Sequence, residues 1–241
     1  DAHFETGADR NLHAAVFFGL GSDGTVSANQ NTISILGEET AYYAQGHFVF
    51  DSKKSGAVTV SHLRFGDTPI RSTYAIGDSQ AEFIACHQST FLENYDLLDK
   101  ARTGATFLLN APWPLDKVWD RLPRHIQAYI ISKQLKVHVI DAYRVAREAG
   151  LGPRINTIMQ TCYFALSGLL PEAEAVRHIK TMVQRTYHFK GGTILEANEK
   201  AIDQALSHLR QLPVPDQVTA THERRNPIPA SASTFVQDVT S

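Results

Sequence analysis

Gly19, Gly21 and Gly24 have the spacing G-x-G-x-x-G, that of a turn able to hold a phosphate group. Residues 12–18 are typical of a buried strand, and residues 25–36 are typical of a helix. Glycines allow a tight turn and close approach of a ligand, and the free N–H groups at the start of the helix attract an anion. We therefore expect a phosphate site here, although ordinary turn glycines would show the same spacing. The other expected members of this site are Ser22, Asp23 and Thr25.

A basic pair follows the second predicted strand, residues 42–50. In a dinucleotide-binding domain an acidic residue at this point holds a ribose hydroxyl, a role open to Asp51. Lys53 and Lys54, followed by Ser55, favour an additional phosphate on the ribose, as NADP and coenzyme A both have. Taken without the glycine turn, the two lysines would more simply belong to a solvated turn between strands.

Arg154 and Asn156 stand at the start of another predicted helix, where they suit a phosphate or an amide. Ligands of open α/β sheets bind at the carboxyl ends of strands. The sequence therefore allows this helix start to meet the glycine turn and the lysine turn at one edge of the sheet. A surface cap or salt bridge is the alternative role for Arg154.

Strands and helices alternate along much of the chain. The predicted strands cover 12–18, 42–50, 57–63, 83–86, 105–109 and 137–140. The predicted helices cover 25–36, 91–100, 114–131 with a break at Pro123, 142–149 behind an Asp141 cap, 155–169, 171–187 and 192–210. This order indicates an α/β fold with an open, mainly parallel, Rossmann-like sheet flanked by helices, a C-terminal helical subregion and an extended tail.

The tail begins where hydrophobic periodicity ends, and it is rich in proline, with Pro213, Pro215, Pro227 and Pro229. Proline cannot continue a helix interior or a central strand. We therefore predict one domain over residues 1–212 and an extended linker or crossover arm over 213–241.

Composition narrows the class of protein. The 241 residues have a net charge of −2, which gives no support to a nucleic-acid or membrane surface, and no apolar run approaches the roughly 20 residues of a membrane span. Cys86 and Cys162 are the only cysteines, and no C-x-x-C occurs, so we expect buried thiols and no metal site. The chain begins without Met or a signal-type pattern, which suggests an excised piece of a cytoplasmic protein.

Several longer strings are more specific than the glycine spacing. They are 18–26 with Ala28-Asn29, Tyr43-Ala44-Gln45-Gly46, Asp51-Ser52-Lys53-Lys54-Ser55-Gly56, 58–64, Pro69-Ile70-Arg71-Ser72 and 154–160. Together they resemble the gamma-type domain of pyruvate:ferredoxin (flavodoxin) oxidoreductases over about residues 13–210. The end of the tail resembles the crossover segment that leads to the next domain of that family. Gln30 is a departure, because the family often has a lysine there.

The resemblance implies a fragment of an enzyme that converts pyruvate and coenzyme A to acetyl-CoA and CO2. Electrons then pass through [4Fe-4S] clusters to ferredoxin or flavodoxin, and thiamine diphosphate supports the carbanion chemistry. The Gly-Asp-Gly signature of thiamine diphosphate, with its later pair of asparagines, is absent at Ser22-Asp23-Gly24, and the cluster cysteines are absent too. The implied role of this domain is coenzyme A binding, and the isolated fragment is expected to be inactive. The implied partners are the other domains of the parent, its electron acceptor and a second copy in a homodimer.

Two other classes of function stay open at this stage. The glycine turn and the lysines would also suit an NADP-type dinucleotide-binding domain, although no clear hydride-transfer acid or second substrate lobe is present. Alternatively, the domain is a structural element that contacts other domains or subunits and binds no nucleotide.

Overall fold

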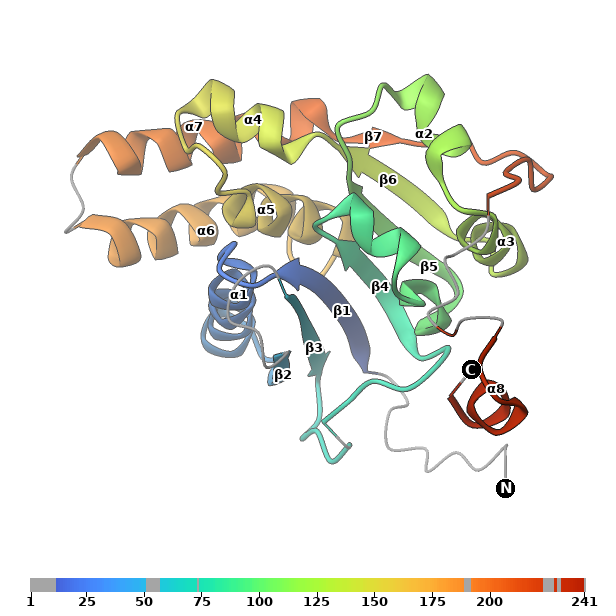
Figure 1. Ribbon diagram of the computed structural model, residues 1–241. Helices are drawn as coiled ribbons and strands as arrows, with labels where there is room; N and C mark the ends of the chain where they lie inside the picture. The colour runs from blue at the N-terminus through green and yellow to red at the C-terminus, as the bar shows by residue number, and fades with distance from the viewer. Residues whose placement is uncertain are drawn as a thin grey trace.

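A single mixed sheet forms the centre of the molecule. The computed structural model describes residues 12–50, 57–72, 74–188, 192–222, 228 and 231–240. In this part of the chain seven strands follow one another in the order β2-β3-β1-β4-β5-β6-β7 (Figure 1). The strands are β1 (His13–Leu20), β2 (Tyr43–Phe50), β3 (Val58–Gly66), β4 (Ala81–Cys86), β5 (Ala101–Asn110), β6 (Lys136–Ile140) and β7 (Arg210–Gln211).

The sheet is parallel at its centre and antiparallel near its edges. β1 pairs in parallel with β4, β4 with β5, and β5 with β6. β3 is antiparallel to both β1 and β2, and β7 is antiparallel to β6. Five strands thus share one direction, which confirms the mainly parallel α/β fold. Each central strand is covered on both faces, which explains its nearly continuous run of apolar residues.

Helices cover the two faces of the sheet. The α-helices are α1 (Thr25–Glu39), α2 (Leu115–Arg121), α3 (Arg124–Ser132), α4 (Ala142–Ala149), α5 (Asn156–Ser167), α6 (Glu172–Tyr187), α7 (Gly192–His208) and α8 (Thr234–Thr240). One buried cluster joins one face of the strands to α1 and to α4 through α7. A second cluster joins the other face to α2, α3 and two 3₁₀ turns, η1 (Ser89–Glu93) and η2 (Leu97–Asp99). Successive side chains of β4 point to opposite faces of the sheet. Phe83 and Ala85 belong to the first cluster, and Ile84 and Cys86 belong to the second.

The helix predicted over 91–100 is wrong, because this segment forms η1 and η2 instead. Asn94 ends η1, and its side chain donates a hydrogen bond to the Thr90 carbonyl oxygen over 3.0 Å. Asn and Asp side chains compete for backbone groups in this way, which favours turns over a continuous helix. Leu97 and Leu98 are nevertheless buried in the second cluster. Their spacing from the apolar residues before them gave this segment the pattern of an amphipathic helix.

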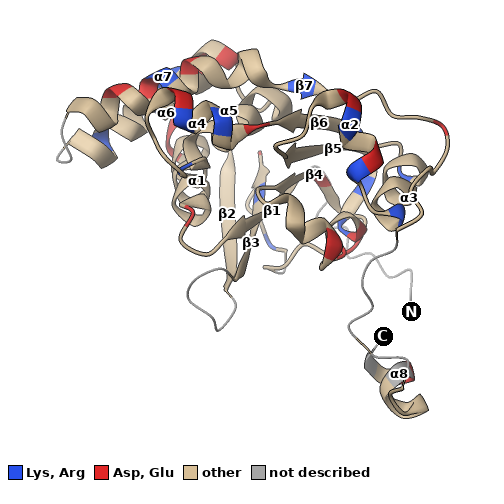
Figure 2. Cartoon of the chain, turned by 45° about the horizontal axis from the view of Figure 1, so that its top comes forward, with Lys and Arg blue, Asp and Glu red and all other residues tan. Residues whose placement is uncertain are grey.

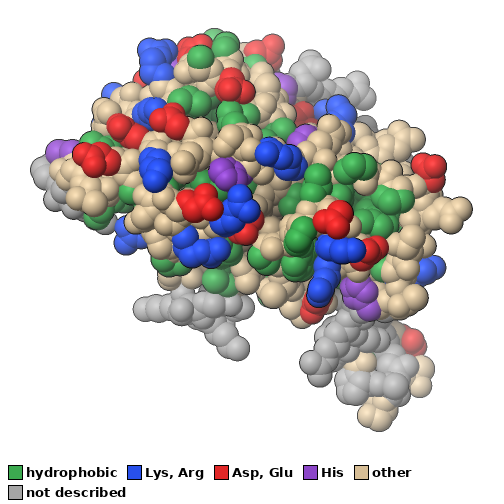
Figure 3. Space-filling view, turned by 90° about the horizontal axis from the view of Figure 1, so that it is seen from above, with side chains coloured by type: hydrophobic (Ala, Val, Ile, Leu, Met, Phe, Trp, Pro, Cys, Tyr) green, Lys and Arg blue, Asp and Glu red, His purple; other side chains and the backbone are tan. Residues whose placement is uncertain are grey.

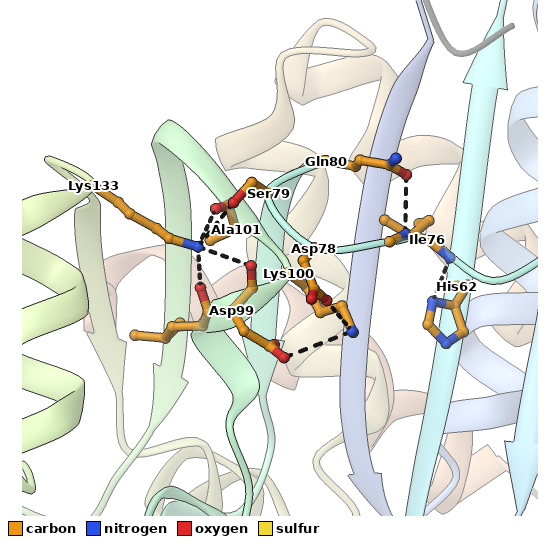
Figure 4. A network of polar contacts seen from close by, with 11 residues as sticks. His62, Ile76, Asp78, Ser79, Gln80, Asp99, Lys100, Ala101 and Lys133 are labelled. Atoms are coloured by element: carbon orange, nitrogen blue, oxygen red, sulfur yellow. Dashed lines mark hydrogen bonds and ion pairs between the residues drawn. The ribbon is translucent and has the colours of Figure 1, made fainter. Parts of the chain in front are cut away.

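Lys133 fixes the junction between η2 and β5. Its Nζ donates hydrogen bonds to the carbonyl oxygens of Leu98, Asp99 and Ala101 over 2.8–2.9 Å (Figure 4). Beside it, Lys100 Nζ pairs with Asp78 over 2.5 Å. These contacts add donors to the carbonyl groups of the short turn. Ala81 N also donates to the Lys100 carbonyl oxygen over 2.8 Å, and Ala81 pairs with Ala101, so β5 begins at Ala101, ahead of the predicted residue 105.

The tail is extended at first and is tied to the domain. Gln127 of α3 is fully buried, and its Oε1 accepts hydrogen bonds from the N–H groups of Thr219 and Ala220 over 2.8 and 2.9 Å. Arg124 N donates to the His222 carbonyl oxygen over 3.0 Å. We call residues 212–222 the strap. Farther on, the tail forms α8, a short helix that the sequence pattern did not predict.

The charges are dispersed over the surface. Lys and Arg alternate with Asp and Glu along α6, α7 and α2 (Figure 2). Seen from above, acidic, basic, His and hydrophobic side chains are interspersed (Figure 3). None of the helices in the described residues has the length and apolar character needed to cross a membrane.

Candidate functional site

The glycine turn connects β1 to α1, as its sequence predicts. β1 ends at Leu20, and Gly24 is the N-cap of α1 with a left-handed φ of 89°. Such a φ favours glycine, and a β-carbon at this position would also lie 2.9 Å from Cγ of Asn156. Gly21 N donates to the Ala57 carbonyl oxygen over 2.7 Å, so the turn is joined to the start of β3.

Asp23 closes the turn upon itself. Its carboxylate accepts hydrogen bonds from the N–H groups of Leu20 and Thr25 over 2.9 and 2.7 Å. The carboxylate therefore takes two amides that a ligand would otherwise use. The N–H groups of Val26 and Ser27, also at the start of α1, have no acceptor among the described residues. An anion at this helix start would face these two amides and the positive end of the helix dipole.

A pocket of about 560 Å³ opens beside these amides. It lies between the glycine turn, the start of α1 and the facing ends of β2 and β3. Its lining consists of Leu20, Gly21, Ser22, Asp23, Gly24, Val26, Ser27, Phe50, Ala57, Val58 and Thr59. The size is in the range of small-molecule sites.

Thr59 gives the pocket an unsatisfied polar group. The residue is 6% exposed, and its Oγ1 is buried with no hydrogen-bond partner in the described structure. Native proteins rarely leave a buried hydroxyl unpaired. Because this Oγ1 has almost no accessible surface, a ligand in the pocket would contact it only after a local shift of the wall.

Thr25 and Gly19 lie behind the turn rather than in the lining of the pocket. Thr25 is 1% exposed, and its Oγ1 forms a 2.8 Å hydrogen bond with Nδ1 of His87. A β-carbon at Gly19 would lie 2.6 Å from Cβ of Thr25. Burial lowers the pKa of His87, an effect that the nearby Asp23 carboxylate opposes.

The structure brings Asn156 to the turn but gives Arg154 no such contact. Asn156 is the first residue of α5, and its side chain packs beside Gly24. One turn later, Gln160 Nε2 donates to the Ala28 carbonyl oxygen over 3.0 Å, which holds α5 against α1. Arg154 is exposed, and within the described residues its backbone N–H donates to the Leu151 carbonyl oxygen.

Lys53, Lys54 and Ser55, together with Asp51, lie outside the described residues. Their neighbours on both sides, Phe50 and Ala57, line the pocket. The described lining contains the carboxylate of Asp23 but no Lys or Arg. A cationic partner for a ligand phosphate would therefore have to come from elsewhere, and the segment between Phe50 and Ala57 contains the two lysines.

Sequence reasoning missed His87 and Thr59. His87 directly follows β4, the strand beside β1, so its position at the carboxyl edge was the available signal. Thr59 reaches the pocket because β3 pairs antiparallel with β1 and places it opposite Gly19. That pairing cannot be derived from local spacing.

Neither cysteine is positioned for reaction. Burial raises the pKa of Cys86 and of Cys162 to about 12, which keeps both as thiols. In the part of the chain that the structure describes, no group of three or more His, Cys, Asp or Glu residues is arranged to hold a metal ion.

Comparison with known proteins agrees with the sequence resemblance. The family model for pyruvate ferredoxin/flavodoxin oxidoreductase matches residues 14–208. The chain belongs to this family. It is 58% identical over 202 residues to a pyruvate-flavodoxin oxidoreductase of Trichormus variabilis, which covers 84% of this chain and 17% of that protein. A pyruvate:ferredoxin oxidoreductase of Moorella thermoacetica is 49% identical over 199 residues, 83% of this chain and 17% of its own. The chain thus spans only 17–20% of the length of curated relatives such as these.

Solved structures confirm the fold. The pyruvate oxidoreductase subunit PORC of Thermotoga maritima has a TM-score of 0.65 at 16% identity, covering 84% of this chain and 99% of that subunit. A 2-oxoglutarate:ferredoxin oxidoreductase of Magnetococcus marinus, solved with 2-oxoglutarate, coenzyme A and succinyl-CoA bound, has a TM-score of 0.60 at 15% identity. That match covers 91% of this chain and 34% of the other chain.

Proposed function

We propose that this chain is the coenzyme A-binding part of a pyruvate:ferredoxin or pyruvate:flavodoxin oxidoreductase. The whole enzyme would convert pyruvate and coenzyme A to acetyl-CoA and CO2. Thiamine diphosphate and [4Fe-4S] clusters would belong to other parts of the enzyme. Its partners would be those other parts, a ferredoxin or flavodoxin and a second copy in a dimer, all in the cytoplasm.

The observation that supports this proposal is a pair of backbone N–H groups in the wall of the pocket. The N–H groups of Val26 and Ser27 have no acceptor among the described residues, and both residues line the pocket. Amides at a helix start suit the diphosphate of coenzyme A. When bound, coenzyme A supplies the thiol that accepts the acetyl group. The residues of this chain would bind and orient its nucleotide end.

The ribose phosphate would need cationic partners, which we assign to Lys53 and Lys54. Asp23 places a negative charge in the pocket, so an anionic ligand gains from compensating cations nearby. Ser55 and Arg154 would add to this group, and Asn156 would support the turn at Gly24.

The strand order disfavours an NADP-type dinucleotide domain. In that fold, the acidic residue that binds the ribose hydroxyl lies at the end of the strand that pairs directly with the first strand. Here β3 lies between β1 and β2, so β2, which precedes Asp51, is one strand farther away. Asp51 itself lies outside the described residues.

Calorimetric titration of the 241-residue chain with coenzyme A, dephospho-coenzyme A and NADP tests the proposal. We expect coenzyme A to bind most tightly and loss of the ribose phosphate to weaken binding. Tighter binding of NADP would support a dinucleotide domain instead. Absence of saturable binding by all three would leave the structural-element interpretation and overturn ours.

A further inference from the structure

We propose that His87 is a positioning residue of the phosphate pocket and acts through the hydroxyl of Thr25. The inference rests on the proposed function, since it concerns how the same pocket is kept ready for a phosphate. Neither side chain lines the pocket. Both are almost completely buried directly behind the turn whose amides face it.

Thr25 is confined on two sides. Its side chain lies against Gly19, where even a β-carbon would approach within 2.6 Å of Cβ and Oγ1. Its Oγ1 is bonded to Nδ1 of His87 over 2.8 Å. Thr25 is also the first residue of α1, directly before Val26 and Ser27, whose N–H groups would receive the diphosphate. The orientation of its side chain therefore bears on where these amides lie.

His87 is itself held by the neighbouring strands. Its N–H donates to the Phe18 carbonyl oxygen over 2.9 Å, and its carbonyl oxygen accepts from Asn110 Nδ2 over 2.9 Å. Oδ1 of Asn110 accepts from Ala142 N over 2.9 Å. A buried series of hydrogen bonds thus runs along the carboxyl edge of the sheet, from the turn after β1 to the start of α4. The backbone of His87 is fixed to this edge, and the ring extends from a fixed point toward Thr25.

Thr25 is the one hydrogen-bond partner that the described residues provide for the imidazole ring. Nε2 is buried without a partner in that part of the chain. Because burial disfavours the imidazolium, the ring is neutral, and either neutral tautomer can form the bond to Thr25. An apolar side chain could fill the same space without leaving a nitrogen unpaired. The geometry therefore points to orientation of Thr25 as the role of this histidine.

Two substitutions remove the bond with little change of volume, namely Thr25→Val and His87→Leu. Thr25→Ser and His87→Asn are the conservative variants, because each retains a polar atom near the bond. Thr32→Val is the matched control. Thr32 is on the same helix, is 1% exposed, and donates its hydroxyl to the Ala28 carbonyl oxygen over 3.0 Å while it accepts from Gln160 Nε2 over 2.9 Å. It lies about two turns beyond Thr25 and outside the lining of the pocket.

Dissociation constants for coenzyme A and for inorganic pyrophosphate are measured by calorimetry, with a melting temperature for each variant. We expect Thr25→Val and His87→Leu each to raise both constants about 10-fold, the effect of one lost hydrogen bond. The double variant should be little worse than either single one, because both remove the same contact. Thr25→Ser and His87→Asn should restore most of the affinity, whereas Thr32→Val should lower the melting temperature and leave both constants unchanged.

If the wild type binds both ligands, and Thr25→Val raises the two dissociation constants no more than Thr32→Val does, this inference is overturned and the proposed function stands. A wild-type chain that binds neither coenzyme A nor pyrophosphate would instead overturn the proposed function and the inference together. If His87→Leu does not fold, Thr25→Val decides the question by itself, because it replaces one hydroxyl by a methyl group.

Discussion

Gly19 stands at a position where a β-carbon has no room. The nearest atoms belong to Thr25, a β-branched and buried side chain whose hydroxyl is already bonded, so it cannot rotate away. Gly37 in the same supersecondary unit is different, because a β-carbon there would meet Cβ of Ala44 at an ordinary 3.6 Å. Packing therefore requires a glycine at position 19, whereas position 37 has room for a larger residue.

We expect Gly19→Ala to lower the free energy of unfolding by about 1–3 kcal/mol, through overpacking. Gly37→Ala lies within α1, and it should raise that free energy by about 0.5–1 kcal/mol, because alanine loses less backbone entropy in a helix. Urea unfolding of the two variants and the wild type measures both effects. Equal stability of Gly19→Ala and the wild type would show that the first turn of α1 can shift.

A second prediction concerns the contribution of Lys53 and Lys54 to the binding of coenzyme A. Lys53→Ala combined with Lys54→Ala should raise the dissociation constant for coenzyme A by about 10-fold or more, since each charge-assisted contact contributes about 1–3 kcal/mol before screening. Binding of dephospho-coenzyme A should change much less. Lys180→Ala with Lys200→Ala removes the same charge from α6 and α7 and serves as the control. Identical calorimetric results for the two double variants would mean that Lys53 and Lys54 are ordinary surface charges.

His62 makes stability depend on pH. Its Nδ1 accepts a hydrogen bond from Ile76 N over 3.1 Å, which requires the neutral ring (Figure 4). Burial first, then the positive charges of His47, Arg64 and Lys100, lower the pKa of His62 from about 6.5 to about 4. Between these values the unfolded chain binds a proton that the folded chain does not, so stability falls as pH falls from 6.5 toward 4.

In His62→Asn this loss should be smaller by on the order of 1 kcal/mol at pH 5, since an amide does not titrate and its oxygen can still accept from Ile76 N. Urea midpoints at pH 7.5 and pH 5 for the wild type and the variant provide the measurement. His87 contributes in the same direction and is present in both chains, so the difference between them isolates His62. Equal losses in the two chains would contradict the assignment.

At the scale of elements, β3 decides what the site contains. The strand and helix on either side of the glycine turn follow from local pattern, and both were predicted with small errors at their ends. The insertion of β3 between β1 and β2 was not, because it depends on pairing between residues 40 positions apart in the sequence, as in Gly19 opposite Thr59. Local spacing therefore revealed Gly21, Asp23 and Gly24 but not Thr59 or Phe50, which β-strand register brings to the same pocket.

The strap is a second element whose contacts are long-range. Gln127→Leu would leave the N–H groups of Thr219 and Ala220 and the carbonyl oxygen of Trp119 without their present partner. We expect it to lower the free energy of unfolding by about 2–4 kcal/mol and to expose the strap to proteases. Gln184→Leu, at an exposed contact with Glu199, should change stability by less than about 0.5 kcal/mol. Similar unfolding curves for the two variants would show that the strap adds nothing to the domain.

At the scale of the whole molecule, the pocket beside the glycine turn combines a volume in the range of small-molecule sites with two N–H groups that have no acceptor among the described residues. The chain spans about a fifth of its curated relatives. The division of the chain into a domain over 1–212 and an arm over 213–241 stays a prediction, and truncation after residue 222, compared with truncation after residue 212, would test it.

We expect the purified chain to show no oxidation of pyruvate, with or without added thiamine diphosphate and a low-potential electron acceptor. The reason is chemical: two buried thiols cannot ligate a [4Fe-4S] cluster, and the sequence lacks the thiamine diphosphate signature. The assay follows acceptor reduction and release of CO2, with an unrelated protein purified in parallel as the control for contaminants. Turnover that copurifies with the chain would refute the division of labour proposed for it.

The contact between Gln127 and the strap also sets an order of events during synthesis. Domains begin to fold from the N-terminal side as the chain leaves the ribosome. α3 emerges long before Thr219 and Ala220, which lie 92 and 93 residues farther along. Until they appear, Oε1 of Gln127 lacks the two N–H groups from which it accepts in the complete chain, and this side of the nascent domain stays open. Completion of the fold is therefore delayed until the segment that leads onward to α8 has been translated.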